Sequence, residues 1–258
     1  MVPRVLVLRA AGSNCDFETK FAFDKAGGRA DLIHVNRLLS GQIKLDQYQI
    51  LAIPGGFTYG DDISAGKIFA NQLKYKLANA LNKFYHEGKL IIGICNGFQV
   101  LVKAGLLPLV DFMAKQSVTL TNNDSGKFED RWIYLKVINN SCIFTRNIKN
   151  TLYFPVAHAE GKFVPNNDSV LKSLIENNQI VFQYVSPKNE KAEYPFNPNG
   201  SVHDIAGICD TTGRVLGLMP HPERHIDPTN NPLWTRKGLS SEGDGLVLFK
   251  NAVQYFLS

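Results

Sequence analysis

The sequence contains no long apolar run. Crossing a bilayer takes about 20 consecutive apolar residues, and no stretch approaches that length in a chain that is 44% hydrophobic and 20% charged. This balance is typical of an ordinary globular protein. The N-terminus, Met1-Val2-Pro3-Arg4, leads directly into a strand-like stretch without the cleavage region of a signal peptide. We therefore expect no membrane interaction and a cytoplasmic location.

Cysteine is scarce and is not arranged in pairs. The four cysteines stand at positions 15, 95, 142 and 209, with no C-x-x-C pair among them. This spacing favours neither a zinc knuckle nor a disulfide framework, so no metal is expected. Most free cysteines are inert buried side chains, and this is our interpretation of Cys15, Cys142 and Cys209. Cys95 lies in a different context, since Gly93 and Gly97 stand on either side of it in the sequence.

A concentrated positive charge is also missing. The formal net charge is +5, and the lysines between positions 74 and 89 occur singly instead of in a basic block. Solvated helix faces explain such lysines better than a nucleic-acid interface does. We expect no nucleic-acid partner, whereas a phosphorylated substrate or an acidic partner surface stays open.

The first hundred residues alternate between short apolar runs and helical patterns. Continuous apolar runs are typical of strands that are buried on both faces of a parallel sheet. Apolar residues at helical spacing between positions 64 and 86 indicate one long helix. Asp16 is the expected cap of a helix that reaches about residue 26. The expected strands are residues 5–8, 30–35, 50–53 and 90–92.

The later part of the chain has a different pattern. Strand-like stretches at 116–138 and 152–164 follow each other with little helix between them, which indicates an antiparallel edge region. Residues 205–219 form an expected hairpin, and residues 244–257 a closing amphipathic helix. No repeat or linker is evident. The prediction is one α/β domain over residues 1–258, with a mostly parallel sheet flanked by helices and an antiparallel edge region.

The strongest chemical signal is the segment Gly93-Ile94-Cys95-Asn96-Gly97-Phe98-Gln99. It lies between an expected strand and an expected helix, so Cys95 stands on a tight strand-to-helix turn whose crowding the glycines relieve. Amides at a helix N-terminus favour a thiolate over a thiol. Cys95 is therefore the candidate nucleophile.

A nucleophilic cysteine requires a base. The best candidate is His221 in Met219-Pro220-His221-Pro222-Glu223, directly after the apolar run at 215–218. Glu223 is placed to orient the imidazole and to stabilise its charged form. Taken alone, this segment is equally compatible with a structural turn that carries a surface histidine. Together with Cys95 it predicts a Cys-His-Glu triad.

A third motif, Pro54-Gly55-Gly56-Phe57, follows another expected parallel strand. The carboxyl ends of parallel strands meet at one edge of a sheet, so this motif is expected beside Cys95. The backbone amides of Gly56 and Asn96 are the predicted oxyanion hole. A proline followed by two glycines is also a routine turn, so this motif by itself is weak evidence.

Together these motifs resemble those of the class I glutamine amidotransferases. Further segments resemble, within that class, the glutaminase subunits of phosphoribosylformylglycinamidine synthase, and the similarity extends over almost the whole chain. These segments are Gly12-Ser13-Asn14-Cys15-Asp16, Gly55-Gly56-Phe57-Thr58-Tyr59-Gly60-Asp61-Asp62, Ser125-Gly126-Lys127-Phe128-Glu129, Ala157-His158-Ala159-Glu160-Gly161-Lys162-Phe163 and Asn197-Pro198-Asn199-Gly200-Ser201.

The resemblance implies a flavodoxin-like fold and a glutaminase activity. Cys95 would be the nucleophile, His221 the general base and acid, and Glu223 its partner. The substrate glutamine would lie beside Gly56 and also beside Gln99, Lys127, Phe128 and Glu129. The resemblance implies no cofactor in this chain. ATP and magnesium would belong to a partner synthetase subunit, which assembles with a small accessory subunit and uses the ammonia to make formylglycinamidine ribonucleotide in purine biosynthesis.

Two other constellations carry less weight. The segment from Gly60 to Ile68 has the wrong spacing for a phosphate loop and lacks the Ser or Thr after its lysine. His158 and Glu160 are better explained as a hydrogen-bonded edge pair than as metal ligands. Two rival functions stay open: a glutaminase that serves another biosynthetic synthetase, and a catalytically idle, redox-sensing relative. The presence of His221 and Glu223 argues against the idle relative.

Overall fold

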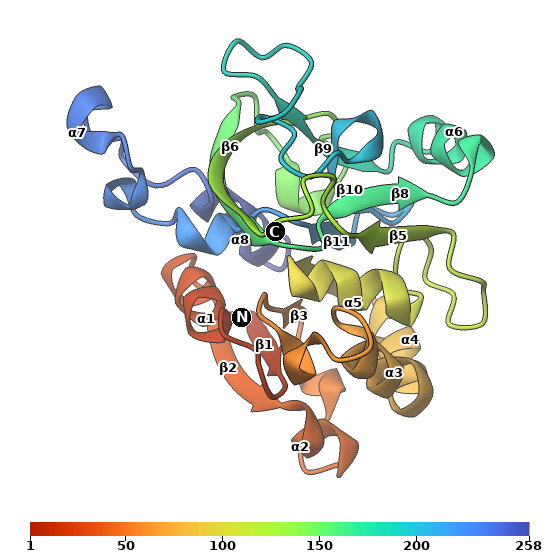
Figure 1. Cartoon of the computed structure of the whole chain (residues 1–258). Coiled ribbons are helices and arrows are strands. Elements are labelled where there is room, and N and C mark those ends of the chain that lie inside the picture. Colours follow the sequence, from red (N-terminus) through yellow and green to blue (C-terminus); the bar gives the residue numbers. More distant parts are fainter. Residues whose placement is uncertain (258) are drawn as a thin grey trace.

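A nine-stranded sheet forms the centre of the computed structural model, which describes residues 1–257 (Figure 1). Its strand order is β2-β1-β3-β4-β11-β10-β9-β6-β7. The pairings among β2, β1, β3, β4 and β11 are parallel, and the pairings from β11 to β7 are antiparallel. The strands are β1 (Arg4–Arg9), β2 (Arg29–His34), β3 (Ile50–Ile53), β4 (Leu90–Ile94), β6 (Glu129–Val137), β7 (Leu152–His158), β9 (Ile180–Val185), β10 (Ile205–Cys209) and β11 (Val215–Leu218).

Helices cover both faces of the parallel half of the sheet (Figure 1). On one side α1 and α8 pack together, with the rings of Phe23 and Phe249 edge to face at 4.9 Å. On the other side α3 lies against α5. This covering explains why the predicted apolar runs are buried on both faces. The helices are α1 (Asp16–Lys25), α2 (Val35–Leu39), α3 (Lys67–Lys76), α4 (Ala78–His86), α5 (Asn96–Ala104), α6 (Asp168–Glu176), α7 (Trp234–Lys237) and α8 (Leu246–Gln254).

The predicted fold class is confirmed, including the antiparallel edge. β6 and β7 are the edge pair of the main sheet, whereas β5 (Val118–Thr121) and β8 (Lys162–Pro165) form a separate two-stranded sheet. The hairpin of β10 and β11 also matches its prediction. Among the helices and strands of the described residues, α2, α6, α7 and β9 were not predicted from the sequence. No helix among residues 1–257 is long and apolar enough to cross a membrane.

Two local predictions are wrong. The expected continuous helix over residues 64–86 is two helices, because Leu77 has φ −119° and ψ 4°, outside the helical region. The apolar spacing continues across the break, so the pattern alone did not reveal it. Asp16 is not the helix cap. Cys15 holds that position, and the Asp16 carboxylate instead pairs with Arg9 at 2.9 Å.

Candidate active site

Cys95 lies on a strained turn between β4 and α5. Its φ of 52° and ψ of −108° are values that a side chain other than glycine rarely adopts. The turn is so tight that glycine is required on both sides. A Cβ at Gly97 would lie 1.9 Å from the Ile53 carbonyl oxygen, and one at Gly93 would lie 2.5 Å from the Gly97 carbonyl oxygen. The backbone is thus strained at Cys95, and this turn places Cys95 at the edge of the sheet where the parallel strands have their carboxyl ends.

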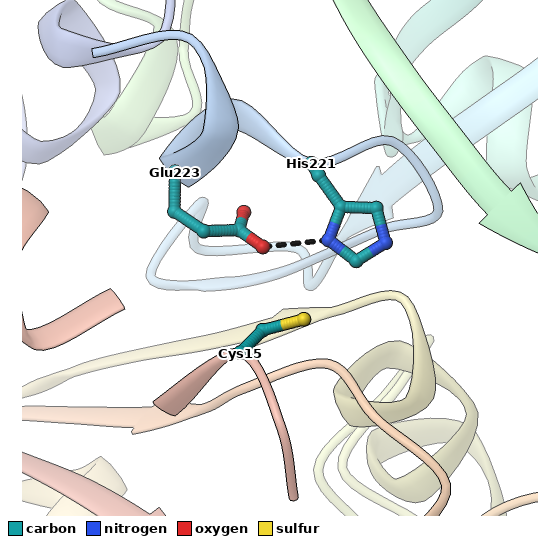
Figure 2. Close-up of side chains that lie close together, drawn as sticks. All are labelled: Cys15, His221 and Glu223. Carbon is teal, nitrogen blue, oxygen red and sulfur yellow. Dashed lines mark hydrogen bonds and ion pairs between the residues drawn. The ribbon is translucent and has the colours of Figure 1, made fainter. Parts of the chain in front are cut away.

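His221 and Glu223 follow the neighbouring parallel strand. Leu218 of β11 pairs with Ile94 of β4, so the residues that come after each strand reach the same edge of the sheet. The His221 amide donates to the Pro155 carbonyl oxygen at 2.9 Å, which ties this segment to β7. The His221 and Glu223 side chains are both buried, and Nδ1 lies 2.6 Å from Glu223 Oε1 (Figure 2).

The charges around His221 favour its protonated form. Burial opposes protonation, but the Glu223 carboxylate, together with the neighbouring Cys95 and Cys15, raises the pKa of His221 well above its ordinary value. Among residues 1–257, no hydrogen-bond partner meets Nε2. With the Nδ1 proton directed at Glu223, Nε2 is free to exchange a proton with a group in the cavity.

A small cavity brings the three motifs together. Its volume is about 160 Å³, and the Cys95 thiol lies 3.8 Å from the Ala157 carbonyl oxygen at its wall. Phe57 and Phe128 line the cavity and are also about half exposed, so the cavity reaches the surface. The lining residues are Asn14, Cys15, Gly56, Phe57, Cys95, Phe128, Ala157, His221 and Arg224.

The two predicted oxyanion donors come from the loop after β3 and from the first turn of α5. Gly56 lines the cavity with φ 144°, and a Cβ there would lie 2.5 Å from the Gly12 carbonyl oxygen. Asn96 is the first residue of α5, so its amide has no acceptor within the helix. The Asn96 side chain accepts from the Thr58 hydroxyl at 2.6 Å and donates to Asp61 at 3.0 Å. These bonds hold the loop after Gly56 against the start of α5.

The predicted substrate residues do not all reach the cavity. Among the described residues of the segment 127–129, Phe128 lines the cavity, whereas Lys127 and Glu129 do not. Glu129 is buried and paired with Arg131. The Gln99 side chain also lies outside the lining and donates to the Glu160 carbonyl oxygen at 2.6 Å.

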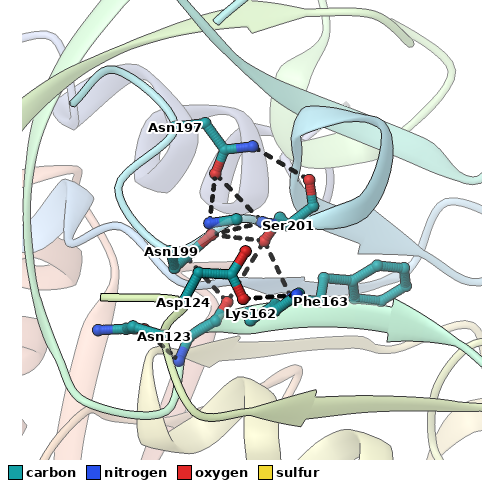
Figure 3. Close-up of polar contacts among 9 residues, drawn as sticks. Asn123, Asp124, Lys162, Phe163, Asn197, Asn199 and Ser201 are labelled. Carbon is teal, nitrogen blue, oxygen red and sulfur yellow. Dashed lines mark hydrogen bonds and ion pairs between the residues drawn. The ribbon is translucent and has the colours of Figure 1, made fainter. Parts of the chain in front are cut away.

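A buried polar network that includes Asn123, Asn199 and Ser201 (Figure 3) holds the segment from His158 to Phe163. The Asn123 side chain donates to the His158 carbonyl oxygen at 2.8 Å and accepts from the Gly161 amide at 3.0 Å. Asn199 donates to the Gly161 carbonyl oxygen at 2.9 Å, and the Ser201 hydroxyl accepts from the Phe163 amide at 2.9 Å. These contacts hold the segment that directly follows Ala157, whose carbonyl oxygen lies 3.8 Å from the Cys95 sulfur.

His158 is a neutral member of this network. Burial, together with the nearby charge of His221, lowers its pKa to about 3. Its Nδ1 lies 3.1 Å from Asn123 Oδ1. The ring is packed so closely that a Cβ at Gly161 would come within 2.3 Å of it. A histidine that stays neutral at physiological pH adds no second positive charge beside His221.

Sequence reasoning missed Cys15 as a site residue, together with Asn14, Ala157 and Arg224 of the cavity lining. The Cys15 side chain is 1% exposed, and the Arg224 guanidinium donates to its sulfur at 3.1 Å. One donor atom from each of Cys15, His221 and Glu223 lies within 4.8 Å of the others (Figure 2). The sequence did contain a feature that could have placed Cys15 in the site. The segment Gly12-Ser13-Asn14-Cys15 follows β1 as Gly55 follows β3, and the ends of parallel strands lie at the same edge of a sheet.

Comparisons with known proteins agree with this arrangement. Residues 2–256 match the family model of the CobB/CobQ-like glutamine amidotransferase domain. The chain is 46% identical over 253 residues to a phosphoribosylformylglycinamidine synthase subunit PurQ from Dehalococcoides mccartyi, covering 98% of this chain and 97% of that protein. It is 44% identical over 266 residues to a protein of the same name from Archaeoglobus fulgidus, covering 98% and 96%.

Two solved structures are also similar to this chain. One chain of the PurLQS structure from Thermotoga maritima superposes with a TM-score of 0.76 at 33% identity, covering 99% of this chain and all of that chain. A glutamine amidotransferase from Thermotoga maritima is 17% identical with a TM-score of 0.53, covering 98% and 91%, and shares the fold alone.

Proposed function

The chain belongs to the CobB/CobQ-like glutamine amidotransferases, and within them to the PurQ subunits of phosphoribosylformylglycinamidine synthase, and we propose that Cys95, His221 and Glu223 carry out its hydrolysis of glutamine to glutamate and ammonia. One observation supports this assignment above all. Cys95 and His221 face one cavity after adjacent parallel strands, and Glu223 holds the imidazole while Nε2 has no hydrogen-bond partner among residues 1–257.

In the first half of the reaction, the Cys95 sulfur attacks the side-chain carbonyl carbon of glutamine, and His221 receives the thiol proton. The amides of Gly56 and Asn96 bind the oxyanion that develops on the carbonyl oxygen. The intermediate collapses when the carbon–nitrogen bond breaks. His221 returns the proton to the departing nitrogen, which leaves as ammonia. Glu223 stabilises the imidazolium that exists between these two transfers.

In the second half, water hydrolyses the γ-glutamyl thioester. His221 takes a proton from the water, the hydroxide attacks the thioester carbon, and the same two amides hold the second oxyanion. The carbon–sulfur bond then breaks, His221 returns the proton to the leaving Cys95 sulfur, and glutamate leaves. Phe57 and Phe128, whose ring centroids lie 6.3 Å apart at the cavity, reduce the access of further water.

The ammonia serves a partner synthetase subunit. The name of the relatives supports this step, since each is a subunit of phosphoribosylformylglycinamidine synthase. The partner, with ATP and magnesium and together with a small accessory subunit, would use the ammonia to convert formylglycinamide ribonucleotide to the amidine in purine biosynthesis. This chain holds no cofactor of its own in the proposal. We place it in the cytoplasm and treat residues 1–258 as one glutaminase domain.

Labelling with a glutamine-like diazoketone tests the catalytic assignment. The reagent alkylates a nucleophile in the glutamine site, so mass spectrometry should find the adduct on Cys95. Cys95→Ala should abolish glutamate release while the fold is retained, and Cys142→Ala, whose site lies in the core, is the matched control. An adduct on another cysteine, or glutamate release by Cys95→Ala at the wild-type rate, would remove Cys95 from the mechanism.

A further inference from the structure

Two thiols, not one, face the active-site cavity. Cys95 precedes the first turn of α5, and Cys15 precedes the first turn of α1. Both line the cavity, and both contribute to raising the pKa of His221. The glutaminase mechanism uses only Cys95. Cys15 is therefore a buried nucleophilic group without a role in that reaction.

Gly55 shows how closely the two cysteines approach. A Cβ built at Gly55 would lie 3.2 Å from Cys15 Sγ, 3.4 Å from Cys95 Cβ and 2.8 Å from His221 Cε1. The three side chains thus surround one point, and because residue 55 is glycine it places no side chain of its own between the two cysteines. The Cys15 amide also donates to the Gly55 carbonyl oxygen at 3.2 Å, which holds the Cys15 loop in this position.

From this geometry we propose that Cys15 and Cys95 form a reversible disulfide when a hydroperoxide oxidises the active site. The proposal rests on the proposed function, in which Cys95 is the reactive thiol. Cys15 is the resolving thiol, and the disulfide converts the glutaminase into an inactive form that a dithiol restores. It also protects Cys95 from oxidation to the sulfinic acid, which ordinary thiols do not reverse.

The chemistry proceeds in two balanced steps. The Cys95 sulfur, after its proton has passed to His221, attacks the terminal oxygen of the hydroperoxide. The oxygen–oxygen bond breaks, Cys95 becomes a sulfenic acid, and the alcohol or water leaves with the proton. The Cys15 sulfur then attacks the Cys95 sulfur as its own proton passes to His221. A sulfur–sulfur bond forms, the sulfur–oxygen bond breaks, and the oxygen leaves as water.

The surroundings of Cys15 suit it for the second step. Burial raises the pKa of the Cys15 thiol, which keeps it protonated and unreactive toward peroxide in the resting enzyme. The Arg224 guanidinium, 3.1 Å from the Cys15 sulfur, and the His221 imidazole then stabilise negative charge on this sulfur as it attacks. Cys95 is thus oxidised first and Cys15 resolves it, because each thiol has a different environment within one cavity.

Peptide mapping after peroxide treatment tests the proposal. The full chain, in the presence of its synthetase partner, is treated with hydrogen peroxide, its free thiols are alkylated, and it is digested without reductant. We expect a crosslinked peptide pair that contains Cys15 and Cys95 and is about 2 Da lighter than the two reduced peptides. Activity should be lost in parallel and most of it regained with dithiothreitol. Peroxide-inactivated wild type without this crosslink would overturn the proposal.

Two variants of Cys15 sharpen the test. In Cys15→Ala and Cys15→Ser, each compared with its own untreated activity, dithiothreitol should no longer restore function, because Cys95 proceeds to the sulfinic acid. The use of two substitutions guards against a folding defect in either one. Cys209→Ala, which removes a buried thiol outside the cavity, should recover like wild type. Equal recovery in a Cys15 variant and in wild type would refute the role of Cys15.

The experiments distinguish an error in the disulfide proposal from an error in the glutaminase assignment. Loss of glutamate release by reduced Cys95→Ala and diazoketone labelling of Cys95 report on the glutaminase alone. If both are observed and no crosslink forms, only the disulfide proposal falls. If reduced Cys95→Ala hydrolyses glutamine normally, the glutaminase assignment falls, whatever the peptide map shows.

Discussion

His221 Nδ1 lies 2.6 Å from Glu223 Oε1, and both side chains are buried. A hydrogen bond to a carboxylate at this distance fixes both the orientation of the ring and the position of its proton. Nε2 is thereby left for chemistry in the cavity. The Glu223 carboxylate also raises the pKa of His221. It therefore stabilises the imidazolium that forms when Cys95 loses its proton to His221.

This pair predicts a ranking of variants. His221→Ala should lower kcat for glutamate release by about 10²–10⁴-fold, the usual contribution of a general acid and base. Glu223→Gln should be milder, because an amide oxygen still accepts from Nδ1 while the negative charge is lost. Steady-state glutamate release measures both. A His158→Ala variant that is more severely impaired in kcat than His221→Ala would mean that the base is the wrong histidine.

The buried neutral His158 predicts a pH-dependent stability. Its pKa is about 3 in the folded protein and about 6.5 in the unfolded chain, so the unfolded chain binds more protons between these values. The lowered pKa of His158 therefore makes the free energy of unfolding depend on pH, and the contribution of the neutral imidazole to stability is complete above pH 6.5. It is lost progressively as the pH falls toward 3, at up to about 1.4 kcal/mol per pH unit.

Urea denaturation at several pH values between 7 and 4 measures this effect. The free energy of unfolding should fall less steeply with decreasing pH in His158→Gln than in wild type, because glutamine cannot titrate. His86→Gln, at an exposed position, is the matched control and should follow wild type. Parallel curves for all three proteins would contradict a neutral, buried His158.

Gly55 predicts an effect on activity that is separate from folding. In Gly55→Ala the added methyl group would meet His221 Cε1 at 2.8 Å, so the imidazole must shift away from its position beside Cys95. We expect kcat to fall by roughly 10-fold or more, since misplacement of a catalytic group by about 1 Å is costly. The melting temperature should change by only a few degrees. Steady-state kinetics and calorimetry on the same preparation measure both effects. An unchanged kcat would contradict a close contact between residue 55 and the His221 ring.

The proposed function predicts dependence on a partner, because the relatives are each named as one subunit of a synthase. Converting an amide to an amidine requires activation of an oxygen as a leaving group, a step that the proposal assigns to the synthetase subunit. Ammonia that is released without an acceptor is protonated and lost to solvent. The isolated chain should therefore be a poor glutaminase, and the synthetase with nucleotide and substrate should accelerate it by shifting the population toward a competent site.

Glutamate release should be measured with the chain alone, with the synthetase, and with synthetase, nucleotide and substrate. The rate should rise across the series, and a Cys95→Ala chain in the full mixture gives the background. Full-rate turnover by the isolated chain would contradict the hypothesis that the synthetase activates glutamine hydrolysis. The exposed segment around Trp234 to Lys237 is one candidate contact surface for the synthetase.

The sequence by itself determined the parallel sheet and the three motifs of the site. Short apolar runs bounded by glycine and proline are local signals, so β1, β3 and β4 were predictable, as was the elbow at Cys95. Parallel strands end at one sheet edge, which was enough to expect Gly56 beside Cys95. His221 was joined to Cys95 by chemistry, because a nucleophilic cysteine requires a base.

Only the tertiary structure decided which other side chains reach the cavity. Cys15 and Arg224 belong to segments far apart in sequence, and their contact depends on how α1 packs beside the loop after β11. Gln99 faces a carbonyl oxygen and Glu129 faces Arg131, although their positions in the motifs suggested substrate contacts. Side-chain direction results from long-range packing and from the need to satisfy buried polar groups, and neither leaves a local pattern in the sequence.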